Sequence, residues 1–192
     1  MSGSRIKKNE LIFSIYKDTR TVFKLKDIAL LVGEENFGSF TQKLNYHVRT
    51  GKLLSPRKGI YAKSGYDKTE LACTLFTPSY ISLEYVLQKA GIIFQYDSRI
   101  TAISYLSRSI EIDGQVYLYR KIKNELLIIT EGIERQANQI NIATPERAFL
   151  DILYLNKEYY FDNLNPLNKE IIYKLLPLFQ SKLLEQKAAK YI

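Results

Sequence analysis

Three short helical patterns followed by a hairpin pattern fill the first third of the chain, and their order restricts the possible folds more than any other feature. Apolar residues recur at helical spacing over residues 9–17. Residues 21–23 are predicted as a short strand, because β-branched and aromatic side chains follow one another there. A second helix is predicted over residues 26–32, where Gly33 can supply the left-handed cap. A third helix is predicted over residues 40–50, so three helices precede the hairpin.

The hairpin pattern is the stretch GKLLSPRKGIYA, in which two apolar runs flank a turn. The turn is expected at residues 55–59, because Pro56 presets the chain direction and Gly59 permits a positive φ. Arg57 and Lys58 therefore lie at the tip of the predicted hairpin.

The third predicted helix has an apolar side and a polar side. Ser39 is its expected N-cap, and Phe40, Leu44 and Val48 recur every four residues as an apolar stripe. The opposite side carries amides that can pair with adenine, an arginine that can pair with guanine, and hydroxyls that can bind phosphate. A solvated face would also be polar but would more often be rich in Glu and Lys, and no acidic residue occurs between residues 37 and 66. The predicted DNA contacts on this helix and in the hairpin are Ser39, Gln42, Lys43, Asn45, Tyr46, Arg49, Arg57 and Lys58.

Positive charge is concentrated in the same part of the chain. Residues 1–68 contain 14 Lys and Arg against 6 Asp and Glu, whereas residues 69–192 contain 14 of each, so the first segment holds the whole formal net charge of +8. Localised positive charge favours a polyanionic partner, with DNA, RNA or an anionic membrane as candidates. A charged face that only confers solubility is the alternative.

The order of the predicted helices and hairpin is that of a winged helix-turn-helix. In that fold the third helix enters the major groove of DNA and the hairpin lies along the backbone. Arg57 and Lys58 would then bind phosphates without reading the base sequence. An ordinary hairpin turn with two solvated cations is the alternative. We predict a winged helix-turn-helix domain over residues 1–66 that binds double-stranded DNA.

Residues 67–192 form the second predicted domain, a mixed α/β domain with antiparallel hairpins, so the whole chain is expected to be α+β. Helices are predicted over residues 67–76, 83–89, 145–155 and 168–190. Strands are predicted over residues 100–106, 109–122, 125–133 and 139–144. Ser82 and Thr144 are the expected N-caps, and Asp113-Gly114 predicts a two-residue hairpin turn. Pro177 is expected to kink or break the last helix.

Three motifs follow one another along the chain: GKLLSPRKGIYA, PSYISLEYVLQKAGII and ATPERAFLDILYL. Their order and spacing resemble the AbiEi family, the antitoxins of type IV toxin–antitoxin (abortive infection) systems. The resemblance runs from about Asn9 to about Leu155, and the middle motif is its most specific part.

The resemblance implies a bacterial repressor that binds the promoter DNA of its own operon through an N-terminal winged helix. It also implies a neighbouring gene for a nucleotidyltransferase-like toxin, whose action the protein counters. The resemblance does not imply direct contact between the two proteins. The larger C-terminal domain would serve antitoxin activity and assist repression. Arg57, Lys58 and Tyr61 match the wing pattern of the family, with Tyr61 packed under the wing.

The sequence predicts no catalytic site, metal site or cofactor. A nuclease would need clustered carboxylates around a metal, or a nucleophile beside its base, and the acidic residues of the C-terminal part are scattered. Glu146 and Asp151 are assigned to helix-dipole compensation and to local pairing with Arg147 or a neighbour. His47, the only histidine, is expected to be partly packed or to donate to a phosphate. The protein is therefore not expected to be an enzyme.

A cytoplasmic location is expected, because the chain has no run of about 18 apolar residues, no secretory signal and one cysteine, Cys73. Tyrosine is abundant, with 15 in the chain, and serves interfaces and packing equally well. The alternative function is therefore a protein-interaction module with a degenerate winged helix and a tyrosine-rich partner-binding domain.

Overall fold

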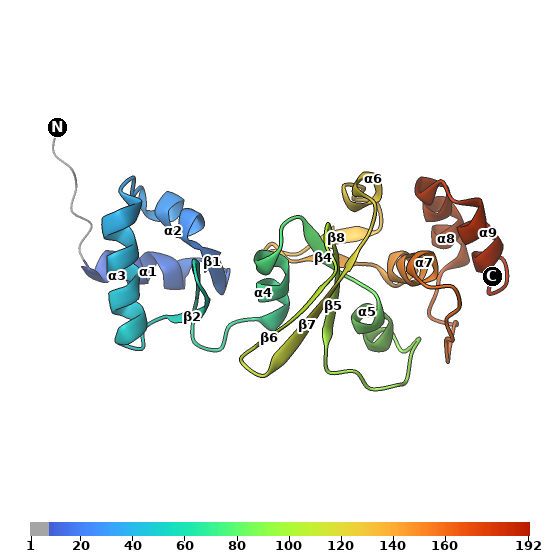
Figure 1. The fold of residues 1–192 in the computed structure, drawn as a ribbon, viewed down its shortest axis with the longest axis horizontal. Helices are drawn as coiled ribbons and strands as arrows, with labels where there is room; N and C mark the ends of the chain where they lie inside the picture. Colours follow the sequence, from blue (N-terminus) through green and yellow to red (C-terminus); the bar gives the residue numbers. More distant parts are fainter. Residues whose placement is uncertain (1–7) are drawn as a thin grey trace. The chain divides into compact units, whose positions relative to one another are not determined.

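The computed structural model describes residues 8–192 and has a mixed α+β structure, as the sequence predicts (Figure 1). The chain divides into two compact units, one ending at Thr74 and the other beginning at Leu75. This division lies in the last turn of helix α4 (Lys68–Leu75), whereas the boundary drawn from the sequence precedes that helix. The two units are described separately below.

The described part of the first unit contains helices, a short strand and a hairpin. In chain order its elements are α1 (Lys8–Lys17), β1 (Val22–Lys24), α2 (Leu25–Val32), α3 (Phe37–Arg49), β2 (Leu54–Arg57), β3 (Ile60–Ala62) and α4. The strands form an antiparallel sheet with the order β1-β3-β2, which places β3 in the middle. The three helices, the short strand and the hairpin expected from the sequence are therefore present, with small shifts at their ends.

The ends of α2 and α3 are set by two different caps. Gly33 follows α2 with a φ of 67°, the left-handed conformation predicted for it. The prediction that Ser39 caps α3 is wrong, because Asn36 occupies the cap and its side chain accepts a hydrogen bond from the Ser39 N–H at 3.2 Å. Asn and Ser are about equally good N-caps, so the residue types alone do not choose between them. Because Asn36 takes the cap, α3 begins at Phe37, one turn earlier than predicted.

The hairpin turn is shorter than predicted. Residues 55–57 belong to β2, which leaves Lys58 and Gly59 as the turn, and Gly59 has a φ of 79°. Pro56 is tolerated because β2 is an edge strand, where a missing N–H breaks no central ladder. The pairing of β2 with β3 is irregular between Leu54 and Arg57. Arg57 is thus the last residue of a strand, and Lys58 lies in the turn beyond it.

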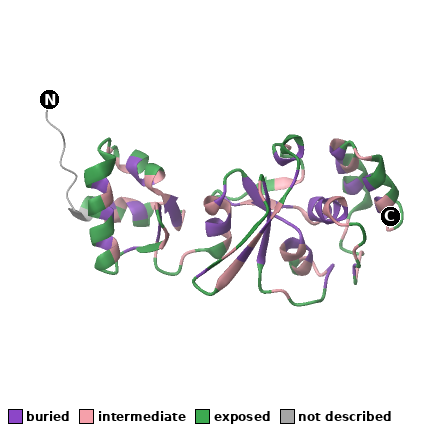
Figure 2. Ribbon diagram, viewed as in Figure 1, coloured by how far each residue is buried: buried purple, intermediate pink, exposed green. Residues whose placement is uncertain are grey.

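One apolar core holds the first unit together. It draws residues from α1, β1, α2, α3 and β3, and it includes the Phe40 and Leu44 stripe predicted for the third helix, with Val48 partly buried beside it. Figure 2 shows these buried segments alternating with exposed ones along α3. Since burying large apolar side chains is the main source of stability, this core fixes which side of α3 faces outward.

The second unit contains a mixed sheet and several helices. In chain order its further elements are β4 (Ser79–Ile81), α5 (Glu84–Lys89), β5 (Ile100–Ser104), β6 (Arg108–Ile112), β7 (Gln115–Lys121), α6 (Asn124–Leu127), β8 (Ile133–Arg135), β9 (Asn141–Ala143), α7 (Pro145–Leu155), α8 (Lys169–Leu175), the 3-10 helix η1 (Leu176–Phe179) and α9 (Lys182–Ala188). The strand order is β6-β7-β5-β4-β9-β8. The β5–β7 and β4–β9 pairs are parallel and the other pairs are antiparallel.

Several predicted features of the second unit are confirmed. Asp113 and Gly114 both have positive φ, 50° and 70°, and join β6 to β7 as a two-residue turn. Thr144 caps α7 by accepting a hydrogen bond from the Arg147 N–H at 3.3 Å. Pro177 lies in η1, where the long C-terminal helical pattern is interrupted.

Two predictions for the second unit are wrong. The strand expected over residues 125–133 is mostly the short helix α6 and a loop. The carbonyls of Leu126 and Glu131 accept hydrogen bonds from the buried guanidinium of Arg147, so their partner is a side chain and not a neighbouring strand. The N-cap of α5 is Leu83, with a φ of 63° and no side-chain cap. Ser82 instead donates its hydroxyl hydrogen bond to a buried carboxylate.

That carboxylate belongs to Asp151, the centre of a buried polar cluster. Arg147 Nε donates to Asp151 Oδ1 at 3.1 Å, and the two side chains are 1% and 0% exposed, so the pairing expected on this helix is confirmed. Tyr80 donates to Asp151 Oδ2 at 3.1 Å and accepts from Arg147 Nη2 at 3.0 Å. Burial raises the pKa of Tyr80 well above its usual value, so its phenol stays a donor. The cluster joins β4 to α7 inside the second unit.

Candidate nucleic-acid interface

The outward side of α3 carries all six of the DNA contacts predicted on that helix. Its buried residues are Phe40, Leu44 and His47. The six predicted contacts are exposed: Ser39, Gln42, Lys43, Asn45, Tyr46 and Arg49. Gln42, Tyr46 and Arg49 are spaced by four and three residues, so they share one line along the helix. This line is the middle of the exposed side.

Two residues on this line are available to a ligand. The side chains of Gln42 and Arg49 have no hydrogen-bond or ion-pair partner within the part of the chain that the structure describes. An amide and a guanidinium are the side chains that form paired hydrogen bonds with adenine and guanine edges. The helix therefore presents these two groups without an internal bond to break.

Lys43 differs from them because it is already paired. Its Nζ donates to Glu34 Oε2 at 2.8 Å, across the turn between α2 and α3. Hydrogen bonding from Lys43, supported by the Asn36 N–H, lowers the pKa of Glu34 below its usual value. The pair was not predicted from the sequence, because Glu34 and Lys43 are nine positions apart on either side of a turn and share no helical period. The one local indication was the position of Glu34 directly after the Gly33 cap, where the chain turns toward α3.

Asn45 and Tyr61 join the helix to the hairpin. Tyr61 is buried on β3, as expected for a residue packed beneath the hairpin, and burial raises the pKa of its phenol. The Tyr61 hydroxyl donates to Asn45 Oδ1 at 3.4 Å. Asn45 is exposed but already has a partner, so the structure separates it from Gln42 and Arg49.

The two predicted contacts in the hairpin, Arg57 and Lys58, differ in exposure. Lys58 is exposed and has no hydrogen-bond or ion-pair partner among residues 8–192, whereas Arg57 is half-buried. Arg57 is therefore less accessible to a ligand than Lys58. Ser39, at the other end of the site, donates its hydroxyl to the Asn36 carbonyl at 3.3 Å.

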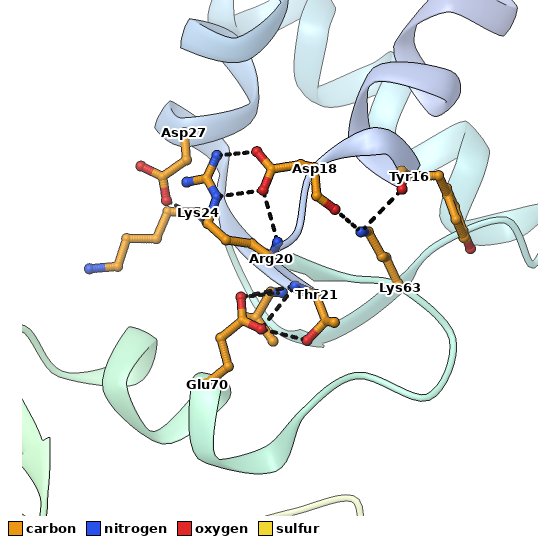
Figure 3. A network of polar contacts seen from close by, with 9 residues as sticks. Tyr16, Asp18, Arg20, Thr21, Lys24, Asp27, Lys63 and Glu70 are labelled. Carbon is orange, nitrogen blue, oxygen red and sulfur yellow. Dashed lines mark hydrogen bonds and ion pairs between the residues drawn. The ribbon is translucent and has the colours of Figure 1, made fainter. Parts of the chain in front are cut away.

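Two further cations of the first unit, Arg20 and Lys63, form hydrogen bonds within a polar network around β1 (Figure 3). Arg20 forms two hydrogen bonds with the Asp18 carboxylate, at 3.0 and 2.7 Å. Lys63 donates to the Asp18 carbonyl at 2.6 Å, and burial lowers its pKa. These contacts stabilise the chain between α1 and β1, so neither cation belongs to the candidate interface.

Glu70 completes this network from α4. Its carboxylate is buried and accepts hydrogen bonds from the Thr21 and Val22 N–H groups, each at 2.9 Å. The Thr21 hydroxyl donates to the same carboxylate at 2.7 Å. Figure 3 shows Glu70 directed at the start of β1, which fixes the first strand of the hairpin sheet.

His47 is buried on α3 and lines the cavity beside that helix. The sequence left it as a partly packed side chain or a phosphate donor, but it is buried beside Phe40 and Leu44 on the inner side of α3. Its ring forms a T-shaped pair with the ring of Tyr46, with centroids 5.4 Å apart. This burial confirms the packed alternative, and the role as a phosphate donor stays a prediction. Within the described residues, no group of three His, Cys, Asp or Glu side chains could hold a metal ion.

A cavity of about 370 Å³ opens beside α3. Its lining combines apolar and polar residues: Leu11, Glu34, Ser39, Phe40, Gln42, Lys43, Tyr46 and His47. The candidate interface therefore has a hollow next to its line of exposed polar groups.

Comparison with known proteins gives no evidence for or against a nucleic-acid interface. No protein-family model matches the chain, and no curated protein matches it either. Between residues 8 and 192, no helix is long and apolar enough to cross a membrane.

Proposed function

We propose that the protein is a DNA-binding transcriptional repressor whose first unit is a winged helix-turn-helix. The observation that carries this proposal is the exposed line of Gln42, Tyr46 and Arg49 on α3, followed directly by a hairpin with Lys58 in its turn. The order of the elements supports this proposal, because a winged helix-turn-helix also has three helices followed by a hairpin.

In this proposal the two parts of the site have different roles. Gln42 and Arg49 read base edges in the major groove, because amide and guanidinium groups recognise adenine and guanine in pairs of hydrogen bonds. Lys58 and the exposed part of Arg57 bind phosphates and add affinity for any sequence. The concentration of the whole net charge of +8 in residues 1–68 attracts the duplex at long range.

We further propose that the repressor is the antitoxin of a type IV toxin–antitoxin system and acts on its own promoter. This step rests on the resemblance of three motifs to the AbiEi family. Two of these motifs contribute Tyr80, Ser82, Arg147 and Asp151, the polar cluster that joins β4 to α7. The antitoxin proposal therefore involves the second unit, while DNA binding involves the first.

A protein-interaction module is the second candidate. It is favoured by large aromatic side chains on the second unit, of which Phe94, Tyr96 and Tyr160 are 67%, 82% and 78% exposed. Aromatic residues are enriched at protein interfaces. In this candidate the positive charge of the first unit would be incidental.

The test is fluorescence anisotropy of the full chain with the duplex upstream of its own gene and with a scrambled duplex, over a salt series. A repressor binds the upstream duplex more tightly, and its affinity falls steeply as salt rises. Equal, weak binding to both duplexes would contradict the proposal and favour the interaction module.

A further inference from the structure

Glu34 is held in a defined position by the end of α2. Its N–H donates to the Ala29 carbonyl at 2.9 Å, and Gly33 before it has the left-handed φ of 67° that completes this cap. The carboxylate is held as well, because the Asn36 N–H donates to Oε1 at 3.3 Å and Lys43 Nζ donates to Oε2 at 2.8 Å. Backbone and side chain thus place one negative charge beside the second turn of α3.

The pair sits at the edge of the candidate interface. The Lys43 side chain is 45% exposed and the Glu34 side chain 18% exposed, so the lysine is the more accessible partner. Lys43 directly follows Gln42, at the flank of the line formed by Gln42, Tyr46 and Arg49. A cation at the flank of a helix in the major groove lies near the phosphates that border the groove.

We propose that Glu34 is a specificity determinant of the DNA-binding surface, which keeps Lys43 paired on the operator and away from the phosphates of other sequences. This inference rests on the proposed function. On the operator, the base contacts of Gln42 and Arg49 fix the position of α3 with the Glu34–Lys43 pair intact. On other DNA no base contact fixes α3, so a free lysine would bind a phosphate and raise non-specific affinity. A paired lysine adds less to non-specific binding, because its partner must be displaced first.

Glu34→Gln tests the proposal, and Glu35→Gln is its matched control. Glu35 is the next residue and is exposed, and its side chain has no hydrogen-bond or ion-pair partner in residues 8–192, so both variants remove one negative charge from the same turn. By anisotropy over a salt series, Glu34→Gln should tighten binding to the scrambled duplex about threefold more than Glu35→Gln does. Its log–log salt slope should become steeper by about 0.9, the value for one additional phosphate contact. Its preference for the operator should fall accordingly.

The same two substitutions in a Lys43→Met background separate release of the lysine from direct repulsion of DNA. If Glu34 acts through Lys43, Glu34→Gln and Glu35→Gln should have equal effects once Lys43 is removed. An advantage of Glu34→Gln that persists without Lys43 would overturn the inference. Circular dichroism and thermal unfolding of each variant show whether it is folded.

Failure of this inference is distinguishable from failure of the proposed function. If the wild type binds the operator but Glu34→Gln behaves like Glu35→Gln, Glu34 is not a specificity determinant and the repressor proposal stands. If the wild type has no preference between operator and scrambled duplex, both proposals fail.

Discussion

The Tyr61 hydroxyl donates to Asn45 Oδ1 at 3.4 Å, and this contact joins the middle strand of the hairpin sheet to the outward side of α3. Asn45 therefore differs from its neighbours on the helix. It can help to orient the hairpin relative to α3, whereas Gln42 and Arg49 have no such partner among the described residues.

From this difference we predict unequal effects of alanine substitutions on base preference. Gln42→Ala and Arg49→Ala should each reduce the preference for the operator by about 1 to 3 kcal/mol, the usual contribution of a paired hydrogen bond to a base. Asn45→Ala should reduce it by less, because its oxygen is used by Tyr61. Competition anisotropy with operator and scrambled duplexes measures this. A loss of preference in Asn45→Ala as large as that in Arg49→Ala would contradict the assignment.

The hairpin cations should affect all DNA sequences alike. Lys58→Ala should weaken binding to operator and scrambled duplex by the same factor and reduce the salt slope by about one unit. Arg57→Ala should have a smaller effect, because its side chain is half-buried. Lys174→Ala, which removes an exposed cation from α8, is the control and should leave the slope unchanged. Equal slopes for Lys58→Ala and the wild type would show that the hairpin does not touch phosphate.

Glu70 should be important for stability, because it holds the start of β1, which lies far from it in the sequence. Its buried carboxylate accepts the Thr21 and Val22 N–H groups, so Glu70→Ala leaves two backbone donors without this partner. Each unsatisfied buried donor costs about 1 to 3 kcal/mol, and we expect a loss of about 3 kcal/mol. Urea unfolding measures it, with the exposed Glu158→Gln as control. A loss below about 0.5 kcal/mol would mean that water replaces the carboxylate.

Removing one hydroxyl from the buried cluster should destabilise the second unit. Tyr80→Phe deletes the group that donates to Asp151 and accepts from Arg147, and both partners stay buried. We expect the free energy of unfolding to fall by about 2 kcal/mol. Tyr160→Phe changes the same group at a site that is 78% exposed and should cost less than about 0.5 kcal/mol. Similar losses for the two variants would contradict the importance of the cluster.

The Asp18–Arg20 pair predicts a dependence of stability on pH. Hydrogen bonding from Arg20 lowers the pKa of Asp18 from its usual 3.8, so the folded state binds this proton less readily than the unfolded state. The stability contributed by the pair is therefore present above pH 3.8 and is lost as pH falls through the lower folded value. Asp18→Asn should lower the midpoint of thermal unfolding at pH 7, and the gap from the wild type should close in acid. A gap that is constant with pH would assign the effect to packing.

The sequence alone determined the local structure of the first unit. Glycines at helix ends and turns, together with apolar residues at helical spacing, predicted three helices and a hairpin. Caps, turns and apolar stripes depend on residues only a few positions apart, so they can be recognised locally. The same holds for the Asp113-Gly114 turn and for the Thr144 cap of α7. Local competition was harder to judge, since Asn36 and Ser39 are equally good caps and only the packed structure selects between them.

The tertiary structure decided which polar side chains are available. Glu34 meets Lys43 across a turn, Tyr61 meets Asn45 between strand and helix, and Glu70 meets Thr21 from a distant helix. None of these pairs follows a helical or strand period, so no local pattern predicts them. Residues 125–133 show the same limit, because two carbonyls of this strand-like run accept hydrogen bonds from Arg147, which lies 16 and 21 positions later in the chain. Long-range hydrogen bonds form only after the chain has folded, and they separate the free contacts on α3 from the occupied ones.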